Sequence, residues 1–476
     1  MLSRLLLITL LAMTAGVLAV AQQPMPFRAR TRTATGGMAA AVDNSALKYF
    51  PPVLNQLGGS CAQAAGIGYM FTYEVNRLLD RDASASAANR LSYQFAWNMV
   101  NEGLDQGGFV CQGLLLARQY GIMTEADYGL PFLMKWPSGY EKYREAMRYR
   151  TDQLFTFDDS VPLMKRYLYD RGDGSATGGV LTFSGQAQGW AIRNDYQGPS
   201  LTGYHSLLTS LATDGSHAMT IVGYDDAVRY ADSTGTVRQG AFIVANSWGT
   251  EWQDRGRFYL PYHFFSDPSV SHLQLSNSVN GVSVRIYEPQ VLLKVRLSYT
   301  SRDDLSFAVA TAPDLSTVAP LTQYPAGAFD HQGGDLPMMG PQLGSEIELA
   351  LDMTDHVSAL DQQYFLNVVR GFGGRQKGEG QLLALSAIDY RSGQAVEYPC
   401  RDSLPRVLQD GNNYFAIPLR PRFTLSASPL RYADESGSLN GETFLIRTAD
   451  GGHAKVRFST PDTEHQTITI RYETKE

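Results

Sequence analysis

The segment of residues 242–252 constrains the fold of this chain more than any other. Four apolar residues, 242–245, lead directly into Asn246, and Trp248 follows two positions later. A short apolar run of this kind is typical of a buried strand, and turn-forming residues such as Asn and Ser commonly follow a strand. The segment therefore predicts a strand that ends by presenting the amide of Asn246, with an indole nearby to shield it from water.

Two further segments carry chemically useful side chains. His217 stands just before the strand-like run 219–222, and Cys61 opens a stretch with apolar residues at spacings of three and four. That spacing predicts an amphipathic helix that begins at or near Cys61. Unpaired amide groups and the positive end of the helix dipole would then lower the pKa of the thiol. The apolar residues that define this helix are Ile67, Phe71, Val75 and Leu78.

A thiol is a weak nucleophile at neutral pH unless a neighbour favours the thiolate, and His217 is suited to be that neighbour of Cys61. Asn246 is suited to bind the far nitrogen of the imidazole, and Trp248 to keep water off that bond. Gln56, with the Cys61 amide, is suited to hold an oxyanion. Singly, each residue is more often structural, since a lone cysteine is usually an inert small hydrophobe. Their joint occurrence in this order favours a site.

In the order Gln56, Cys61, His217, Asn246, these segments resemble the papain-like cysteine proteases. The resemblance covers about residues 49–262 and implies a two-lobed α+β catalytic domain, with a helical lobe and a β-barrel-like lobe. It implies peptide-bond hydrolysis with no cofactor and no metal. It also implies that Gly107 and Gly108 form a wall of the substrate cleft, where bare backbone pairs with an extended peptide.

The spacing of the motifs agrees in part with this family. From Cys61 to His217 is 217 − 61 = 156 residues, close to the roughly 130–150 expected. From His217 to Asn246 is 246 − 217 = 29 residues, which is longer than expected. The polar stretch 225–236 accounts for the excess and predicts an enlarged hairpin loop.

The chain departs from the family pattern at three points. Ala62 stands where the family has tryptophan, and no cysteine precedes the nucleophile, so Cys111 lacks its usual partner. Whether Cys111 pairs with Cys400 is open. Gln56 and Cys61 are five positions apart where six are expected. The oxyanion role therefore falls either to Gln56 or to backbone N–H groups alone.

The N-terminus predicts export. Residues 1–21 contain Arg4, an apolar run over 5–18 and a small-residue end at 19–21, the three parts of a cleaved signal peptide. The run is shorter than the roughly 20 apolar residues of a membrane span. We expect a secreted, periplasmic or cell-envelope protein, of bacterial type because no N-glycosylation sequon is present. Residues 22–48 form a leader expected to be a flexible tether. Either the enzyme is not held latent by an N-terminal domain, or the leader lies in the cleft.

The charge of the chain excludes one class of partner. The formal net charge is −7 and the pI is about 5.7, and basic residues cluster only around Arg30, so nucleic acid is not an expected partner.

We place the catalytic domain at 49–288 and an all-β sandwich or jelly-roll domain at 289–476, from alternating strands at 291–297, 345–351 and 467–472. The stretch 298–307 faintly resembles the opening of a P-domain.

The sequence thus predicts an exported cysteine endopeptidase that acts on protein or peptide substrates through an acyl-enzyme. The C-terminal domain is expected to bind a surface, a substrate or a partner protein. Two rivals remain. A transglutaminase-like acyltransferase also uses Cys, His and an orienting side chain in this order. A catalytically inactive papain-fold protein would use the same scaffold for binding or adhesion, and Ala62 and the short Gln56–Cys61 spacing favour it.

Overall fold

The computed structural model describes most of the chain between residue 36 and residue 419, and four short strands outside that range. The described ranges are 28–29, 36–132, 134–157, 160–271, 274–275, 279–312, 315–326, 333–357, 362–371, 377–419, 443–447, 453–458 and 470–474. The predicted signal peptide lies outside them, as do residues 22–27 and 30–35 of the leader. Within these ranges no helix has both the length and the apolar character that a membrane crossing requires.

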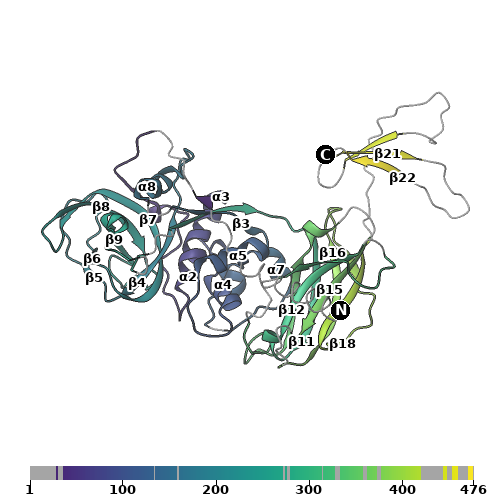
Figure 1. Cartoon of the computed structure of the whole chain (residues 1–476). Coiled ribbons are helices and arrows are strands. Elements are labelled where there is room, and N and C mark those ends of the chain that lie inside the picture. The colour runs from purple at the N-terminus through teal and green to yellow at the C-terminus, as the bar shows by residue number, and fades with distance from the viewer. Residues whose placement is uncertain are drawn as a thin grey trace, which may run out of the picture.

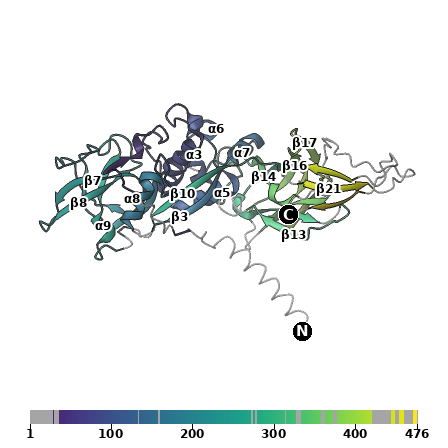
Figure 2. The ribbon, with the colours of Figure 1, turned by 90° about the horizontal axis from the view of Figure 1, so that it is seen from above.

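Helices occupy the middle of the molecule, with β-structure on either side (Figure 1). The view from above in Figure 2 gives the same succession, with β7 (Asp214–Ala231) and β8 (Val237–Ala245) at one end and β14 (Glu346–Asp352) and β16 (Gly380–Asp389) beyond the helices. This arrangement confirms the predicted fold class, a helical lobe and a sheet lobe followed by an all-β region. The helices of the middle part are α2 (Cys61–Gln63), the π-helix η2 (Ala64–Phe71), α3 (Thr72–Leu79), α4 (Tyr93–Val100), α5 (Val110–Tyr120), α6 (Glu125–Tyr128) and α7 (Tyr140–Ala146).

The first three of these helices are continuous in sequence and run from Cys61 to Leu79, so the predicted amphipathic helix is confirmed. Ile67 and Val75 are fully buried as the spacing predicts, whereas Leu78 is exposed near the helix end. The helix ends where Asp80 adopts a left-handed conformation with φ of 52°, a common way to terminate helical hydrogen bonding.

A large, mostly antiparallel sheet forms the second lobe, with the strand order β1-β3-β10-β4-β7-β8-β9-β6-β5. The second part of strand β8, residues 240–245, is buried on both faces. Phe242 and Val244 pack into the core inside the sheet lobe, while Ile243 and Ala245 pack into the core that contains the helices. This alternation follows from the two-residue period of a strand. The bounds are β1 (Arg28–Ala29), β2 (Ala41–Asp43), β3 (Tyr149–Thr156), β4 (Leu181–Gln188), β5 (Ala191–Arg193), β6 (Leu207–Ser210), β7 (Asp214–Ala231), β8 (Val237–Ala245), β9 (Arg257–Pro261) and β10 (Asn280–Ile286), with helices η1 (Asn44–Ala46), η3 (Ala87–Asn89), α8 (Val161–Asp170) and α9 (His263–Ser266).

The prediction that residues 225–236 form an enlarged loop is wrong, because most of this stretch is paired strand. Strand β7 continues to Ala231 and pairs with β8 as far as Val237, so most of the extra length is paired strand. A register shift between Asp225 and Arg229 marks a bulge. Only residues 232–236 turn, and Asp232 accepts hydrogen bonds from the backbone of Thr234 and Thr236.

The segment 36–48 of the expected leader contacts the sheet lobe. Residues 41–43 form β2, which pairs antiparallel with β7 at Gly223–Asp225. The side chain of Tyr224 also donates to the carbonyl of Ala39, and Asn44 is buried, where it donates to the carbonyls of Leu168 and Gly179. The sequence had not indicated this pairing.

Among the described residues, the C-terminal region contains three sheets, with strand orders β14-β11-β16-β17, β13-β12-β15-β19 and β20-β21-β22. Buried residues of the first two sheets belong to one hydrophobic cluster, as expected of a sandwich. The predicted strands at 291–297 and 345–351 lie in β11 and β14, whereas the stretch 467–472 lies partly outside the described residues. The bounds are β11 (Val291–Tyr299), η4 (Arg302–Asp304), β12 (Leu305–Ala312), β13 (Thr322–Pro325), β14 (Glu346–Asp352), η6 (Thr354–His356), β15 (Gln362–Arg370), β16 (Gly380–Asp389), β17 (Val396–Pro399), β18 (Arg406–Val407), β19 (Gly411–Leu419), β20 (Thr443–Arg447), β21 (His453–Phe458) and β22 (Ile470–Thr474).

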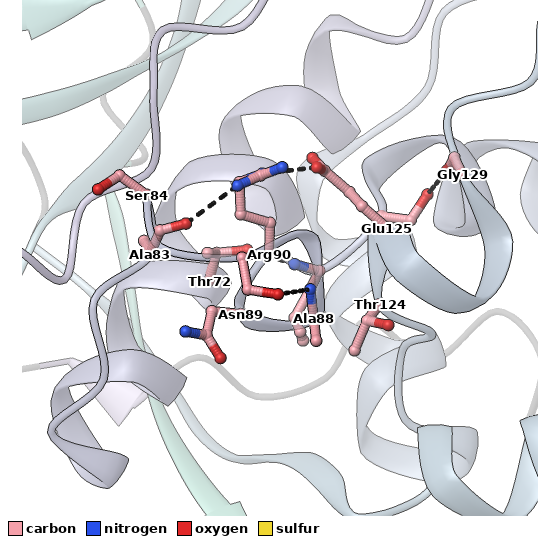
Figure 3. A network of polar contacts seen from close by, with 12 residues as sticks. Thr72, Ala83, Ser84, Ala88, Asn89, Arg90, Thr124, Glu125 and Gly129 are labelled. Carbon is pink, nitrogen blue, oxygen red and sulfur yellow. Dashed lines mark hydrogen bonds and ion pairs between the residues drawn. The ribbon is translucent and has the colours of Figure 1, made fainter.

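Inside the helical lobe, a polar network ties the η3 turn to α6 (Figure 3). Arg90 donates from Nε to the Glu125 carboxylate at 2.6 Å and from Nη1 to the Ala83 carbonyl at 3.2 Å. The backbone N–H of Glu125 donates in turn to the Arg90 carbonyl at 2.8 Å. Because both side chains are mostly buried, the network fixes the η3 turn against the start of α6.

Candidate active site

The thiol of Cys61 lies at the first residue of the long helix. Ser60 precedes it and receives hydrogen bonds at its carbonyl from the backbone N–H groups of Gln63 and Ala64 at 3.0 and 2.9 Å. The Ser60 hydroxyl donates to the Leu57 carbonyl at 2.7 Å, so the loop before the helix is folded back on itself. Cys61 is partly buried.

His217 and Asn246 form a direct hydrogen bond across two neighbouring strands. His217 lies within β7, and Asn246 follows the last residue of β8. The distance from His217 Nε2 to Asn246 Oδ1 is 2.8 Å, and the same oxygen accepts from the Ser247 backbone N–H at 2.7 Å. Because an amide oxygen can only accept, Nε2 carries the hydrogen. Nδ1 of the neutral ring is therefore the nitrogen with a free lone pair, as a general base requires.

Trp248 covers this pair. Its ring stacks on the His217 imidazole with centroids 4.6 Å apart and an interplanar angle of 22°. Trp252 packs edge-on against Trp248 at 5.2 Å, and Phe258 packs edge-on against Trp252 at 5.6 Å. The aromatic series holds the imidazole from one face and restricts the water that reaches its bond with Asn246.

Burial shifts the pKa values of both candidate catalytic groups. It raises the pKa of the Cys61 thiol, and the backbone N–H groups of Ala218, Ala62 and Cys61 offset part of that rise. Burial also lowers the pKa of His217, whereas the hydrogen bond with Asn246 raises it again in part. Each group by itself is thus held neutral, contrary to the expected net lowering at Cys61 by the helix start. A thiolate–imidazolium pair at this site would therefore depend on the mutual attraction of the two charges.

The Ala218 amide shows how close the two groups lie. Its N–H reaches the Cys61 sulfur, and Ala218 directly follows His217 in β7. Two more bonds hold the strand ends against the helix. Thr220 Oγ1 donates to the Ala65 carbonyl at 3.2 Å, and Tyr69 OH donates to the Asn246 carbonyl at 2.8 Å.

Gln56 is fixed at the same site by Ser247. The Ser247 hydroxyl donates to Gln56 Oε1 at 2.5 Å, and the Gln56 backbone N–H donates to the Ser247 carbonyl at 2.8 Å. With its oxygen engaged, the Gln56 amide directs its NH₂ group toward the loop before Cys61, where it donates to the Gly58 carbonyl at 3.1 Å. One further N–H of that group is available to a ligand.

Gly107 and Gly108 are exposed and lie next to the loop that precedes the helix. A Cβ atom on Gly59 would come within 2.5 Å of the Gln106 carbonyl carbon and 2.8 Å of the Gly107 nitrogen. The two backbones therefore touch, and a glycine is required at position 59. The structure thus places Gly107 against Gly59, two residues before Cys61.

The other two cysteines are unpaired. Cys111 in α5 and Cys400 after β17 are both free thiols, so they do not pair in this structure. Sequence reasoning missed the supporting residues Ser247 and Tyr69. Ser247 lies within the Asn246 motif, but nothing in the sequence links it to Gln56, 191 positions away.

Comparison with known proteins identifies the family that this region resembles. Residues 59–264 match the family model described as papain family cysteine protease, which confirms the resemblance inferred from the motifs. An uncharacterized peptidase C1-like protein of Acanthamoeba polyphaga mimivirus is 24% identical over 227 residues, covering 45% of this chain. The chain spans 65% of the length of that relative.

Several solved structures are similar to this chain at a lower sequence identity than the viral relative. Xylellain, a cysteine protease from Xylella fastidiosa, is 18% identical, with a TM-score of 0.39 over 55% of this chain and 92% of its own. Recombinant stem bromelain precursor is 17% identical, with a TM-score of 0.34 over 53% and 75% of the two chains. Digestive procathepsin L 3 of the Tenebrio molitor larval midgut is 16% identical, with a TM-score of 0.36 over 57% and 79%.

Proposed function

We propose that this chain, in which residues 59–264 match the papain family cysteine proteases, is an exported cysteine endopeptidase. The observation that carries the proposal is the 2.8 Å bond between His217 Nε2 and Asn246 Oδ1, made on a strand whose next residue, Ala218, contacts the Cys61 sulfur. This bond leaves Nδ1 of the imidazole to exchange a proton with the thiol.

Acylation begins with the Cys61 proton moving to His217 Nδ1. The thiolate attacks the carbonyl carbon of the peptide, forming a C–S bond, and the carbonyl oxygen takes the electron pair as an oxyanion. The C–N bond then breaks as the His217 imidazolium gives its proton to the departing amine. The first product leaves as a free amine, and the acyl group stays on sulfur.

Deacylation reverses the proton movement. Neutral His217 takes a proton from a water molecule while the water oxygen attacks the thioester carbon. The C–S bond breaks, the acid product leaves, and the thiolate–imidazolium pair is restored. The oxyanion of each step is held by the Cys61 backbone N–H and the Gln56 NH₂ group, whose orientation depends on Ser247.

Export and the route to an active form are part of this proposal. The signal-peptide pattern of residues 1–21 supports export. Residues 39–43 of the leader hydrogen-bond to β7 near Gly223, which is six residues along that strand from His217, or roughly 20 Å at an ordinary strand rise. This contact favours a leader whose described part covers the sheet lobe and does not fill the cleft.

The test is hydrolysis of a quenched protein substrate by the mature chain under reducing conditions, with Cys61→Ala as the inactive variant. Cys111→Ala is the matched control, because Cys111 is also a partly buried free thiol at the start of a helix. We expect activity in the wild type and in Cys111→Ala, and none in Cys61→Ala. Equal activity in all three would overturn the proposal, because hydrolysis would then not depend on Cys61. Folded wild-type protein with no activity would also overturn it, and would favour the binding-scaffold alternative.

A second arm separates hydrolysis from acyl transfer. The same reactions are run with a fluorescent primary amine and a glutamine-containing protein. Water as the acyl acceptor predicts hydrolysis in excess over amine incorporation. Incorporation in excess would favour the transglutaminase-like alternative instead.

A further inference from the structure

The loop before α5 is supported from the side of the C-terminal domain. Gly103 adopts a left-handed conformation with φ of 73°, and a Cβ atom there would meet Leu336 Cδ1 at 2.8 Å and the Gly333 carbonyl at 3.0 Å. Reciprocally, a Cβ on Gly334 would come within 2.1 Å of the Glu102 carbonyl oxygen. The backbones of residues 102–103 and 333–334 therefore lie in direct contact, 230 positions apart in sequence.

This same loop carries the contacts to the catalytic helix. Asp105 Oδ1 accepts from the Gly59 backbone N–H at 2.7 Å, two residues before Cys61. Trp97 Nε1 donates to the Gln106 carbonyl at 3.0 Å and holds the loop to α4. The loop of residues 101–108 is thus placed between the helix start, α4 and the turn of residues 333–336.

The internal hydrogen bonds of this loop all involve Asn101, which accepts from the Gly103 backbone N–H at 2.9 Å and from Gln106 Nε2 at 3.3 Å. Glu102 is a non-glycine residue in the left-handed region, with φ of 56°, a conformation that persists only where the surroundings hold it. Residues 104–109 are all exposed. The Asn101 carbonyl accepts a hydrogen bond from the Leu104 backbone N–H at 3.0 Å. A loop of this kind depends on its neighbours for a fixed shape.

A buried cation anchors the supporting turn. Arg302 in η4 is 1% exposed, and its guanidinium donates to the Gly333 carbonyl at 2.7 Å, the Met338 carbonyl at 3.2 Å and the Met134 carbonyl at 3.0 Å. It also lies over the Trp136 ring at 4.5 Å. Because Met134 and Trp136 belong to the helical lobe, Arg302 fixes the turn to that lobe.

The segment around Met134 is held to α4 as well. Met134 N donates to Asn98 Oδ1 at 2.8 Å, and Trp136 Nε1 donates to the Asn98 carbonyl at 3.1 Å. Asn98 is fully buried. The turn of residues 333–336 and the loop of residues 101–108 are therefore attached to the same part of α4.

We propose that the C-terminal domain positions the substrate cleft, by holding loop 101–108 through the turn 333–336 so that Gly107 and Gly108 stay in place beside Cys61. This inference rests on the proposed peptidase function. It makes Gly334, Leu336 and Arg302 positioning residues for binding of an extended peptide. An extended substrate that pairs with the Gly107–Gly108 backbone would sense a shift of the loop, and a short substrate that does not reach it would not.

The test uses point variants of the whole mature chain. Gly334→Ala adds a methyl group into the Glu102 carbonyl, and Leu336→Ala removes the contact over Gly103 without adding bulk. Gly393→Ala is the matched control, because Gly393 also has a left-handed conformation, with φ of 80°, but nothing lies within 4 Å of its Cβ position. If Gly334→Ala does not fold, Leu336→Ala carries the test.

Two measurements are made on each variant. Hydrogen exchange of peptides covering residues 101–108 should accelerate in both test variants and not in Gly393→Ala. For an extended peptide substrate, KM should rise about 3- to 10-fold with kcat nearly unchanged, the range expected for loss of one peptide hydrogen bond. For a short ester substrate, KM should not change.

The outcomes separate this inference from the proposed function. Unchanged exchange of residues 101–108 would overturn the inference whether or not the protein is active. An active wild type with the same KM in all variants would also overturn it. A wild type without Cys61-dependent hydrolysis would instead overturn the proposed function, and with it the part of the inference that concerns substrate.

Discussion

Removing the side chain that binds the imidazole gives the most informative perturbation of the site. Asn246→Ala deletes the acceptor that lies 2.8 Å from His217 Nε2 without adding bulk. During catalysis that bond is made to an imidazolium, and a hydrogen bond to a charged group contributes about 1.5–3 kcal/mol. At about 1.36 kcal/mol for each factor of ten, kcat/KM should fall about 10- to 150-fold.

The same substitution should move the alkaline limb of the pH profile. Burial lowers the pKa of His217, and the hydrogen bond with Asn246 raises it again in part. Without that bond, only the lowering effect of burial on the pKa remains. The folded-state pKa then falls further, and the imidazolium is lost at lower pH. The alkaline limb of kcat/KM should therefore shift to lower pH. Asn246→Asp keeps an acceptor and adds a negative charge, so it should shift the limb in the opposite direction.

The assay is the pH dependence of peptide hydrolysis by the wild type, the two variants and Asn367→Ala. Asn367 is a matched control, since it is a buried asparagine in β15 that is hydrogen-bonded to Gln323 and Asn412. Its loss should affect stability and leave the alkaline limb unchanged. Identical limbs for Asn246→Ala and Asn246→Asp would refute the reasoning, because the bond would then have no influence on His217.

Three more outcomes follow from other contacts. Trp248→Ala removes an aromatic contact at 4.6 Å from His217, worth about 0.5–1.5 kcal/mol, so kcat/KM in steady-state assays should fall about 2- to 12-fold, whereas Trp248→Phe should retain most activity. Arg150→Met leaves Asp352 without its 2.6 Å ion-pair partner in a mostly buried site, so chemical denaturation should show a loss of about 3–5 kcal/mol; a change below about 1 kcal/mol would contradict this. At Asp225, burial acts to raise the carboxyl pKa, but backbone hydrogen bonds prevail and lower it. Stability from this group is present above its unfolded pKa and is lost as pH falls through the lowered value, so Asp225→Asn should flatten that acidic loss in thermal melts.

The sequence located the candidate residues because their signals are local. The strand before Asn246 follows from an apolar run, and the helix from Cys61 follows from the spacing of Ile67 and Val75. Each pattern spans fewer than twenty residues, a length over which hydrophobic periodicity is informative. The family motifs then supplied the order in which these segments meet.

The sequence could not give the contacts that join distant segments. The Ser247 hydroxyl that fixes Gln56 and the Asp105 carboxylate that holds Gly59 are ordinary loop residues by composition. Arg302 stands among polar residues in the sequence, yet it is buried against three carbonyl groups. Such contacts depend on tertiary packing, which overrides local pattern.

Local pattern also misled at the excess residues before Asn246. The polar stretch 225–236 has the composition of a loop, but most of it is paired as an extension of β7 and β8. Strand pairing there is set by register with the partner and by the bulge at Asp225–Arg229. The polar residues of the turn, 233–236, are exposed, whereas Asp225 is buried and accepts backbone hydrogen bonds. Composition alone does not distinguish such a hairpin from a loop.

The central claim is that Cys61 and His217 act as one nucleophile–base pair. It is tested most directly by the pH dependence of Cys61 alkylation with iodoacetamide, followed by mass spectrometry, in the wild type and in His217→Ala. Burial alone raises the pKa of this thiol, so alkylation in His217→Ala should require a pH above the ordinary range for cysteine. In the wild type the imidazolium should make Cys61 reactive well below pH 7, faster than Cys111 and Cys400. Identical profiles for Cys61 in the two proteins would contradict the account.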